Sequence, residues 1–579
     1  MRFLRMLTNS LIAGALGAAF LTIVVVQLNP HVPLASVTPW RWFMTLGLLY
    51  GVQIAVGCYV VIVAREFFAM DAMSPGWASV RVLAWLSAAL AAAAAALMWL
   101  NVQGFEQALG DEAARRMTAG AIATTASALV LLTIAVAHYS FGRRGSRVGA
   151  SLFALAVVAS LALPLVARGT GTPGIQGPAA WTSQPSGMSP AADGPRVTLI
   201  ALDGASLEFI MPRAAEGRLP NFSRVIEGGA AIDLATTRPT QPDPVWAAVA
   251  TGMYPGTSGV RSAAQYYARR DRRGIDLLPD HCLCHALVRL GLVRDEPRSS
   301  DQWTARPLWG VLSDAGLSTG IVRWPLTHPA QTARGFVVSD RFHQAVGSVS
   351  ELERAAYPPE ALPLLQAATA SSTAVSTEGV ATWFTPGSPE AAVLKRDLLY
   401  ARIARSLQAE RHPRFLSVRY EGLDVVGHHY LRYTQPPAPR GVPEAVRRSF
   451  AQVIERYYAF IDAELGAALE AMHAGDLVVV VSGFGMHRTN PLKRALSRAL
   501  RDPDLSGTHE RAPDGFLLAY GSAVQHGRPQ RGSIVDVTPT LLYFFGLPVA
   551  LDMDGFARSD LFTREFTTER PITFIPSYR

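Results

Sequence analysis

The sequence predicts a bundle of five transmembrane helices followed by an α/β domain, in which helices flank a mostly parallel central sheet. Three observations predict this arrangement. Five long apolar segments come first, a stretch rich in Gly, Pro and Ser follows, and short apolar strands then alternate with helical patterns. We therefore expect a membrane region at residues 1–168, a flexible linker at 169–195 and an outer domain at 196–579.

The apolar segments are long enough to span a hydrocarbon core, which takes about 20 helical residues. They lie approximately at residues 9–28, 41–64, 79–100, 117–139 and 148–167. Arginines precede the first span and occupy the loops after the second and the fourth, namely Arg2, Arg5, Arg65, Arg143, Arg144 and Arg147. The positive-inside rule then places the N-terminus in the cytoplasm and the outer domain on the other side. We expect a bacterial inner-membrane protein with a periplasmic domain.

The spans contain almost no ionisable residues. Because charge inside a membrane is costly and is kept for function, this composition disfavours a transporter. It favours an anchor, or an anchor that also holds a lipid substrate. Since four further spans follow and no small-residue cleavage site is evident, the first span is not expected to be a signal peptide.

The composition limits the classes of partner and of covalent framework. The formal net charge is +8, nearly all of the cations are arginines, and no dense basic stripe is interleaved with aromatics, so nucleic acid is not expected as a partner. Three cysteines, Cys58, Cys282 and Cys284, are too few for a disulfide framework. The segment "DHCLCH" indicates a helix start with small buried thiols rather than a zinc site, because no second ligand pair follows at zinc-site spacing.

Candidate metal ligands follow the predicted strands of the outer domain. Asp203 ends the apolar run "VTLIALD", although an Asp before Gly is also a common turn former or helix cap. Asp424 and His428 are four residues apart after the strand in "RFLSVRYEGLDVVGHHY", so on a helix they face one way. His509 lies in a glycine-bounded loop before another strand. Carboxylate and imidazole are both zinc ligands, while structural roles stay open for each residue.

The stretch "LVVVVSGFGMH" is a predicted buried strand with an unusual end. Chemistry collects beyond the carboxyl ends of such strands in open α/β sheets. Here the turn contains Ser482, Gly483, Phe484 and Gly485, and it offers no carboxylate, imidazole or thiol until His487. His487 could supply an imidazole to the site, or it could simply face solvent after the glycine turn.

The order of these motifs resembles the alkaline phosphatase superfamily, in its type I phosphodiesterase/nucleotide pyrophosphatase branch. The resemblance rests on "LIALDGASLEFI", "GRLPNFSRVIEGGA", "PVWAAVATGMYPG", "EGLDVVGHHY", "GTH…DGFLLAYG" and "IVDVTPTLLYFFGLPVALDMDG", and it covers nearly all of residues 197–579. It implies an alkaline phosphatase-like fold, two metal ions, usually zinc, and a Thr or Ser nucleophile that attacks phosphorus in line. Lipoteichoic acid synthases and phosphoethanolamine transferases also join five spans to such a domain.

Carried over residue by residue, the resemblance assigns one complete metal site to Asp424, His428 and His509. The other site would use Asp203, the nucleophile and the Asp-His pair of a Ser-Asp-His-Gly motif. That motif is Ser-Gly-Phe-Gly here, and Phe484 stands where a ligand is expected.

The nucleophile position also departs from the family pattern. It falls on Pro242, which has no nucleophilic atom, and Thr240 and Asp243 flank it. A one-residue shift would place Asp243 there as a nucleophile or ligand, whereas Thr240 would need a larger loop adjustment. A further departure is Ser258-Gly259, where the family has His-Gly.

All of these losses fall in one metal site, so we expect one divalent ion, zinc in the family, rather than two. The first hypothesis is a membrane-anchored phosphodiesterase or phosphohydrolase that acts on a phosphate ester, such as a lipid headgroup or a nucleotide. Attack would come from metal-bound water, Asp243 or Thr240. The second is an inactive relative that binds a phosphorylated ligand or a partner protein.

Arg323, Arg341 and His343 could contact phosphate oxygens, unless the arginines are paired with carboxylates.

Overall fold

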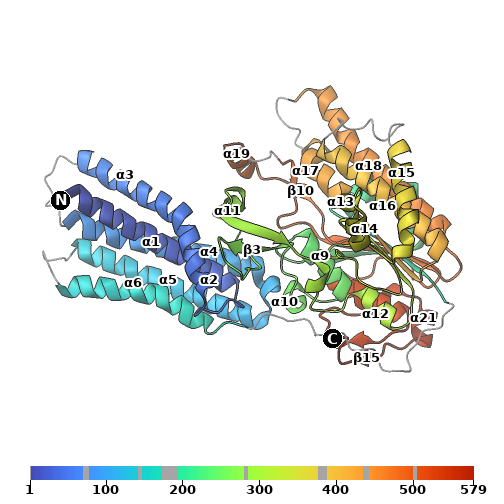
Figure 1. Cartoon of the computed structure of the whole chain (residues 1–579), viewed down its shortest axis with the longest axis horizontal. Helices are drawn as coiled ribbons and strands as arrows, with labels where there is room; N and C mark the ends of the chain where they lie inside the picture. The colour runs from blue at the N-terminus through green and yellow to red at the C-terminus, as the bar shows by residue number, and fades with distance from the viewer. Residues whose placement is uncertain are drawn as a thin grey trace. The chain divides into compact units, whose positions relative to one another are not determined.

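The computed structural model describes residues 2–68, 77–140, 147–172, 194–279, 285–375, 388–434, 442–499 and 505–579. The chain divides into two compact units (Figure 1). Unit 1 comprises Met1–Ile175 with Arg261–Arg298, and unit 2 comprises Gln176–Val260 with Ser299–Arg579. Cys282, Cys284 and most of the expected linker lie outside the described residues.

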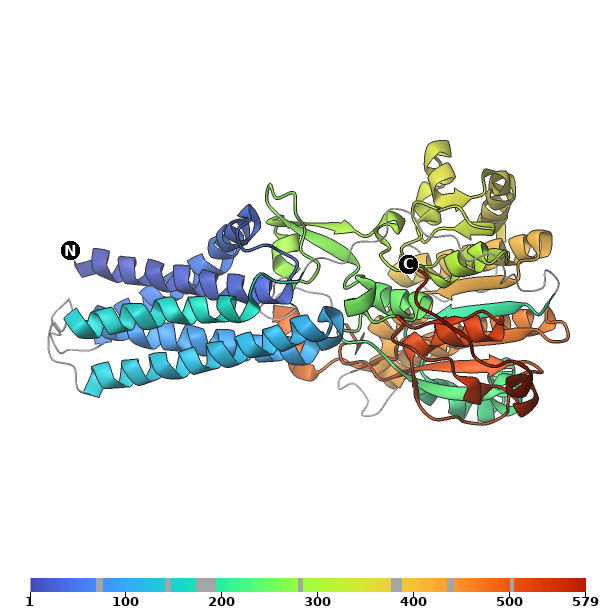
Figure 2. The same ribbon diagram turned by 90° about the horizontal axis from the view of Figure 1, so that it is seen from below.

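Unit 1 contains five helical segments that are long and apolar enough to cross a membrane, which confirms the expected number. The second segment is interrupted by a π-helical turn, η1, and the helices run alongside one another in Figures 1 and 2. The elements are α1 (Arg2–Leu28), α2 (Val37–Leu46), η1 (Gly47–Gly51), α3 (Val52–Phe68), α4 (Trp77–Leu109), α5 (Asp111–Ser140) and α6 (Arg147–Arg168).

Glycines allow α1 and η1 to touch by their backbones. A Cβ added at Gly14 would lie 2.3 Å from the carbonyl oxygen of Gly51, so only glycine fits without a shift. Within a membrane the hydrophobic effect does not drive helices together, because lipid tails are as apolar as the helices. Small residues at such contacts allow the close packing that holds the helices together instead.

Residues 261–298 fold with the membrane helices rather than with the sheet. They form the antiparallel pair β3 (Ala264–Ala268) and β4 (Val293–Pro297) and the short helix α11 (His285–Arg289). Apolar side chains of this insertion pack against α1 and α2 in one buried cluster that includes Ile275, Leu278, Leu287, Val25, Trp42 and Leu46.

Asn29 ties the insertion to the end of α1. Its carboxamide oxygen accepts hydrogen bonds from the backbone N–H groups of Asp276 (3.0 Å) and Leu277 (2.9 Å). Its amide nitrogen donates to the carbonyl of Leu277 at 2.8 Å and to that of Val25 at 2.9 Å. One buried side chain thus satisfies three backbone groups of the insertion.

Unit 2 is built on a nine-stranded sheet with the order β13-β2-β12-β9-β1-β8-β5-β6-β7. Only the pairings of β12 with its two neighbours and of β6 with β7 are antiparallel, which confirms the mostly parallel sheet. The strands are β1 (Val197–Leu202), β2 (Ala230–Ala235), β5 (Thr319–Val322), β6 (Gly335–Val338), β7 (Ala356–Tyr357), β8 (Phe415–Tyr420), β9 (Leu477–Ser482), β12 (Gly515–Tyr520) and β13 (Gly532–Ser533).

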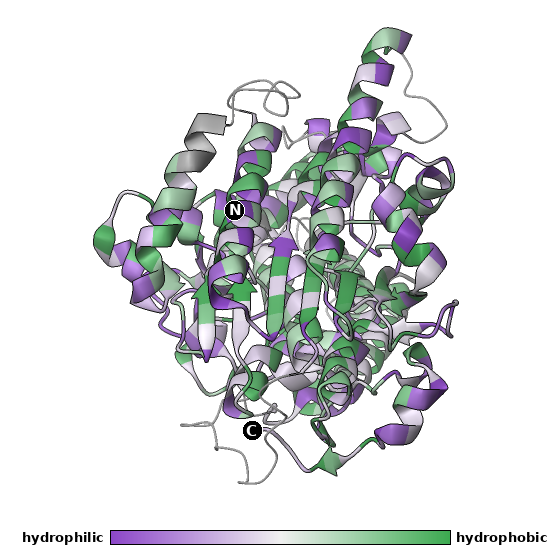
Figure 3. Ribbon diagram, turned by 90° about the vertical axis from the view of Figure 1, so that its right-hand side faces the viewer, coloured by the Kyte–Doolittle hydropathy of each residue, from purple (hydrophilic) through white to green (hydrophobic). Residues whose placement is uncertain are grey.

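Helices cover both faces of this sheet, and alternate residues of each strand enter one of two cores. In β1, Ile200 and Leu202 join the first core, while Leu199 and Ala201 join the second. Strands buried on both faces read as continuous apolar runs, and they are mostly green in Figure 3.

The first core packs beneath α7 (Leu207–Ala215), α8 (Pro220–Gly228), α14 (Val349–Ala355), α15 (Leu362–Val375), α16 (Pro389–Arg411), α17 (Gly422–Thr434) and α18 (Glu444–Glu470). The second packs beneath α9 (Pro242–Thr251), α12 (Leu308–Asp314) and α20 (Val537–Phe544). The remaining elements of unit 2 are short: α10 (Pro255–Ser258), α13 (Phe342–Ala345), β10 (His487–Arg488), α19 (Pro491–Ala499), β11 (Gly507–Thr508), β14 (Val549–Ala550), α21 (Arg564–Glu569) and β15 (Phe574–Ile575).

Candidate metal centre

The carboxyl ends of β1, β8 and β9 meet at one edge of the sheet. The parallel register places Leu202 beside both Tyr420 and Ser482. Asp203 follows β1 directly, and Asp424 lies in the first turn of α17, just after β8. The fold therefore gathers the predicted ligands where an open α/β sheet builds its sites.

Three of the four predicted metal ligands form a cluster. Asp424, His428 and His509 each offer a ligand atom, and these atoms lie within 4.8 Å of one another. The Nε2 atom of His428 is 3.5 Å from Oδ2 of Asp424, one helical turn earlier in α17. His509 follows β11, and its ring centroid is 5.2 Å from that of His428.

Backbone carbonyls orient both imidazoles. The Nδ1 atom of His428 is 2.8 Å from the carbonyl oxygen of Gly507, and that of His509 is 2.8 Å from the carbonyl oxygen of Thr240. Because a carbonyl only accepts, each Nδ1 carries the proton and each Nε2 keeps a lone pair for a metal. This is the usual outer hydrogen bond of a metal-bound histidine.

The Oδ1 atom of Asp424 is buried and has no hydrogen-bond partner among the described residues. A buried carboxylate oxygen left without a partner is costly, and a bound cation would satisfy it. One carboxylate and two imidazoles also match the ligand chemistry of zinc. The residues present therefore fit a single divalent ion.

Asp203, the fourth predicted ligand, is held by other groups. Arg419 donates to both of its oxygens, from Nε to Oδ1 at 3.0 Å and from Nη2 to Oδ2 at 2.5 Å. Trp246, in α9, donates from its indole nitrogen to Oδ1 at 2.6 Å. Both Asp203 and Arg419 are buried.

The end of β9 is closed by packing. Phe484 is fully buried, and its ring centroid is 5.3 Å from that of His509. A Cβ added at Gly483 would lie only 2.3 Å from Cγ1 of Val245 in α9. The position that the family pattern assigns to an aspartate thus has no room for a side chain unless Val245 moves.

A chain of paired charges extends behind Asp203, and all of its members except the half-buried Glu421 are buried. Arg419 also pairs with Glu421 at 3.0 Å, Glu421 pairs with Arg323 at 2.5 Å, and Arg323 pairs with Asp397. Burial alone would raise the pKa of Glu421, but Arg323 and Arg419 outweigh it and lower that pKa to about 2. Arg323 is thus paired with Asp397 and Glu421. Of the two roles considered for it, the structure favours an ion pair with carboxylates over a contact with phosphate oxygens.

The two candidate nucleophiles occupy different environments. Asp243 is half-buried in the first turn of α9, where burial, reinforced by the charges of Asp340 and Asp203 against the opposing Arg419, raises its pKa to about 7. Thr240 is buried, and its hydroxyl donates to the carbonyl of Thr237 at 2.9 Å.

The remaining histidines and arginine weighed from the sequence lie outside the cluster. His487 is in β10, which pairs with β11, and it is not a member of the metal-ligand group. The Nδ1 atom of His343 is 3.1 Å from the hydroxyl of Tyr400, and Arg341 lies 4.0 Å from Asp340. Burial, with Arg396 and Arg323, lowers the pKa of His343 to about 4.

Sequence reasoning missed Arg419. The signal was present, because a charged residue within the apolar strand "FLSVRY" is almost always paired when it is buried. The carbonyl role of Thr240 and the indole of Trp246 had no comparable signal, since any residue carries a carbonyl and a Trp in an apolar helix is usually core.

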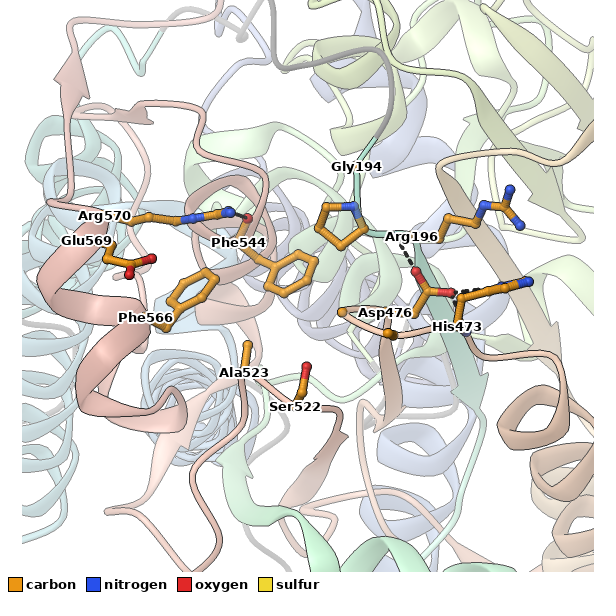
Figure 4. A pocket seen from close by; sticks show the side chains of 13 residues that line it. Gly194, Arg196, His473, Asp476, Ser522, Ala523, Phe544, Phe566, Glu569 and Arg570 are labelled. Atoms are coloured by element: carbon orange, nitrogen blue, oxygen red, sulfur yellow. Dashed lines mark hydrogen bonds and ion pairs between the residues drawn. The ribbon is translucent and has the colours of Figure 1, made fainter.

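A pocket of about 590 Å³ lies at the opposite edge of the sheet, near the starts of β1 and β9 (Figure 4). Asp476, one of its two carboxylates, accepts from the backbone N–H groups of Arg196 (2.7 Å) and His473 (2.9 Å). Arg570 donates to the carbonyl of Phe544 at 3.0 Å. These polar groups are occupied within the chain, so we assign them a structural role.

The comparison with known families agrees with the fold and with the candidate ligand group. The profile of the type I phosphodiesterase / nucleotide pyrophosphatase family matches residues 197–537, more than half of the chain. The chain belongs to this family, which confirms the resemblance.

Among solved structures, the chain is similar to human ectonucleotide pyrophosphatase / phosphodiesterase 5, with 14% identity and a TM-score of 0.39. It is also similar to the murine protein, including an inactive form in complex with AMP, with 14% identity and a TM-score of 0.38. Each comparison covers 64% of this chain and 100% of the other. No curated protein sequence matches.

Proposed function

We propose that this chain is a membrane-anchored phosphodiesterase-type hydrolase with a one-metal centre at Asp424, His428 and His509. The observation that carries the proposal is the preset ligand group, in which both imidazoles are oriented by carbonyls and one oxygen of Asp424 has no partner among the described residues. Five apolar helices supply the anchor. The substrate would be a phosphate ester, such as a lipid headgroup or a nucleotide.

A divalent ion bound by these ligands would act as a Lewis acid toward a phosphoryl oxygen. The chain itself supplies the orientation of the ligands through Gly507 and Thr240. Asp243, with its pKa near 7, is the group suited to take a proton from the attacking water at neutral pH. We assign Thr240 to the positioning of His509, because its hydroxyl already donates to Thr237.

The test is metal analysis of the purified full chain together with hydrolysis of bis(p-nitrophenyl) phosphate. We expect one ion per chain, and we expect Asp424→Asn and His509→Ala to lose the ion and to lower hydrolysis at least about 100-fold. His526→Ala is the matched control, because His526 is exposed and outside the cluster, and it should change neither value.

A second candidate function is an inactive relative that binds a phosphorylated ligand or a partner protein. Two observations favour it: Asp203 is held by Arg419, and Phe484 stands at the end of β9. A chain that binds one ion but turns over neither phosphate monoesters nor diesters would support this candidate over the hydrolase.

We also propose that the N-terminus lies in the cytoplasm of a bacterium and that unit 2 works in the periplasm. The support is the placement of arginines before the first span and after the second and fourth. A C-terminal alkaline phosphatase fusion should then be active, and a C-terminal green fluorescent protein fusion exported unfolded should be dark. The reverse pattern would contradict this orientation.

A further inference from the structure

Asp203 and Asp424 stand at the same edge of the sheet but in opposite states. Within the part of the chain that the structure describes, one oxygen of Asp424 has no hydrogen-bond partner, and two imidazoles lie beside this carboxylate. Asp203 receives three hydrogen bonds, two of them from one guanidinium in the forked geometry that carboxylates bind best. Asp424 is therefore available to bind a cation, whereas Asp203 is already paired with the guanidinium of Arg419.

Burial and several contacts fix the side chain of Arg419 beside Asp203. It is buried in a strand of the central sheet, and its third contact, through Nη1, is to Glu421 at 3.0 Å. A guanidinium does not lose its proton in a protein, so the positive charge is permanent. An ion that bound Asp203 would have to displace Arg419 and leave that charge buried without its partner, which is strongly unfavourable.

The end of β9 supplies no metal ligand to the Asp203 side. Gly483 faces Val245 at a distance that excludes a Cβ, and the next residue, Phe484, fills buried space beside His509. Trp246, one residue beyond Val245, takes a further lone pair of Asp203. Helix α9 thus closes the Asp203 side of the edge with its own side chains.

We infer that Arg419 is the resident cation of the Asp203 side and that it restricts this chain to one divalent ion, bound at Asp424, His428 and His509. A second ion, which the family resemblance implies, does not fit the residues present. The identity of the occupied site rests on the proposed function, whereas the exclusion at Asp203 stands on the contacts of Arg419. Arg419 is a positioning residue here, because it acts through Asp203.

The experiment counts bound zinc per chain by mass spectrometry of the metal content after equilibration and desalting, with the full chain in detergent. We expect one ion in the wild type and one in Asp203→Asn, which keeps the shape of the side chain but removes its charge. Arg419→Met removes the cation that lies among the carboxylates of Asp203, Glu421 and Asp243 and leaves a side chain of similar volume, so we expect the count to rise from one to two.

Two matched variants identify the added ion. Arg419→Lys keeps the positive charge and should stay at one, while Arg419→Met combined with Asp203→Asn should lose the added ion. Loss of the wild-type ion in Asp203→Asn would overturn the inference, as would a wild type with two ions. A correctly folded Arg419→Met chain that gains none would overturn it as well.

If Arg419→Met does not fold, the zinc count of Asp203→Asn tests the inference, because a chain that loses a metal ligand should also lose bound zinc. A wild type with no ion, or an ion that survives Asp424→Asn, would contradict the proposed function. Even then, an ion gained by Arg419→Met and lost again with Asp203→Asn would support the exclusion at Asp203, so the two failures can be told apart.

Discussion

At the scale of single residues, Asp243 makes folding depend on pH. Its pKa is raised to about 7 in the folded chain, against about 3.9 in an unfolded one. Protonation of Asp243 favours the folded state. This contribution to stability is fully present below the pKa of the unfolded chain, and it is lost as the pH rises through the pKa of the folded chain, about 7. In metal-free protein we therefore expect Asp243→Asn to be more stable than the wild type at pH 8, by up to about 4 kcal/mol, with little difference at pH 4.

Thermal unfolding followed by tryptophan fluorescence across this pH range would measure the effect. The difference in Tm should grow between pH 4 and 7 and then level off. Asp233→Asn is a suitable control, because Asp233 is exposed in β2. A difference that is constant with pH would show that Asp243 is ionised normally in the folded chain.

The buried charges that support the edge also act at the residue scale. Arg323→Met would leave Asp397 without its guanidinium partner, and breaking a buried pair from one side costs about 3–5 kcal/mol. Arg354→Met, at the surface pair with Glu351, should cost less than about 1 kcal/mol. Chemical denaturation of the two variants compares the costs, and equal losses would contradict a buried structural role for Arg323.

At the scale of elements, helix α9 determines what the end of β9 can contain. Gly483→Ala places a methyl group against Cγ1 of Val245, and overpacking of this kind costs about 1–3 kcal/mol. Adding Val245→Ala removes the clash, so the double variant should be less destabilised than the sum of the single variants. The unfolding free energies of the wild type, the two single variants and the double variant form a double-mutant cycle. Additive effects would show that Val245 moves away from residue 483 at little cost.

At the scale of the whole molecule, residues 261–298 belong to the unit of the membrane helices although they lie between strands of the sheet domain in sequence. Asn29→Ala would leave two backbone N–H groups and one carbonyl of the insertion without partners. We expect the amides of Asp276 and Leu277 to exchange hydrogen at least about 10-fold faster, since a lost bond is worth about 1 kcal/mol or more.

Hydrogen exchange followed by mass spectrometry of the detergent-solubilised chain would detect this change. Gln53→Ala is the control, because it removes a similar amide side chain that is exposed on α3. Unchanged exchange at residues 276 and 277 would mean that the hydrophobic cluster alone holds the insertion.

The sequence predicted much of the fold because its patterns are local. Apolar runs of strand length located β1, β8 and β9, and the Asp424 and His428 spacing placed both side chains on one face of α17. The membership of residues 261–298 in unit 1 could not be predicted in this way, because β3 and β4 carry no membrane-like hydropathy and the packing of β3 onto α2 is a contact between distant segments.

The sequence by itself determined the five apolar helices, the mostly parallel sheet and the family, and the resemblance to that family indicated the three candidate metal ligands. The helices and strands follow from periodicity, which is a property of neighbouring residues, and the family follows from the order of motifs along the chain. Only the tertiary structure decided the state of Asp203, because Arg419 and Trp246 reach it from a different strand and a helix. It also decided why Gly483 and Phe484 end β9: the space that an acidic ligand would need is filled by α9 and by the Phe484 ring. A missing motif residue is visible in sequence, but the group that replaces its charge is visible only in space.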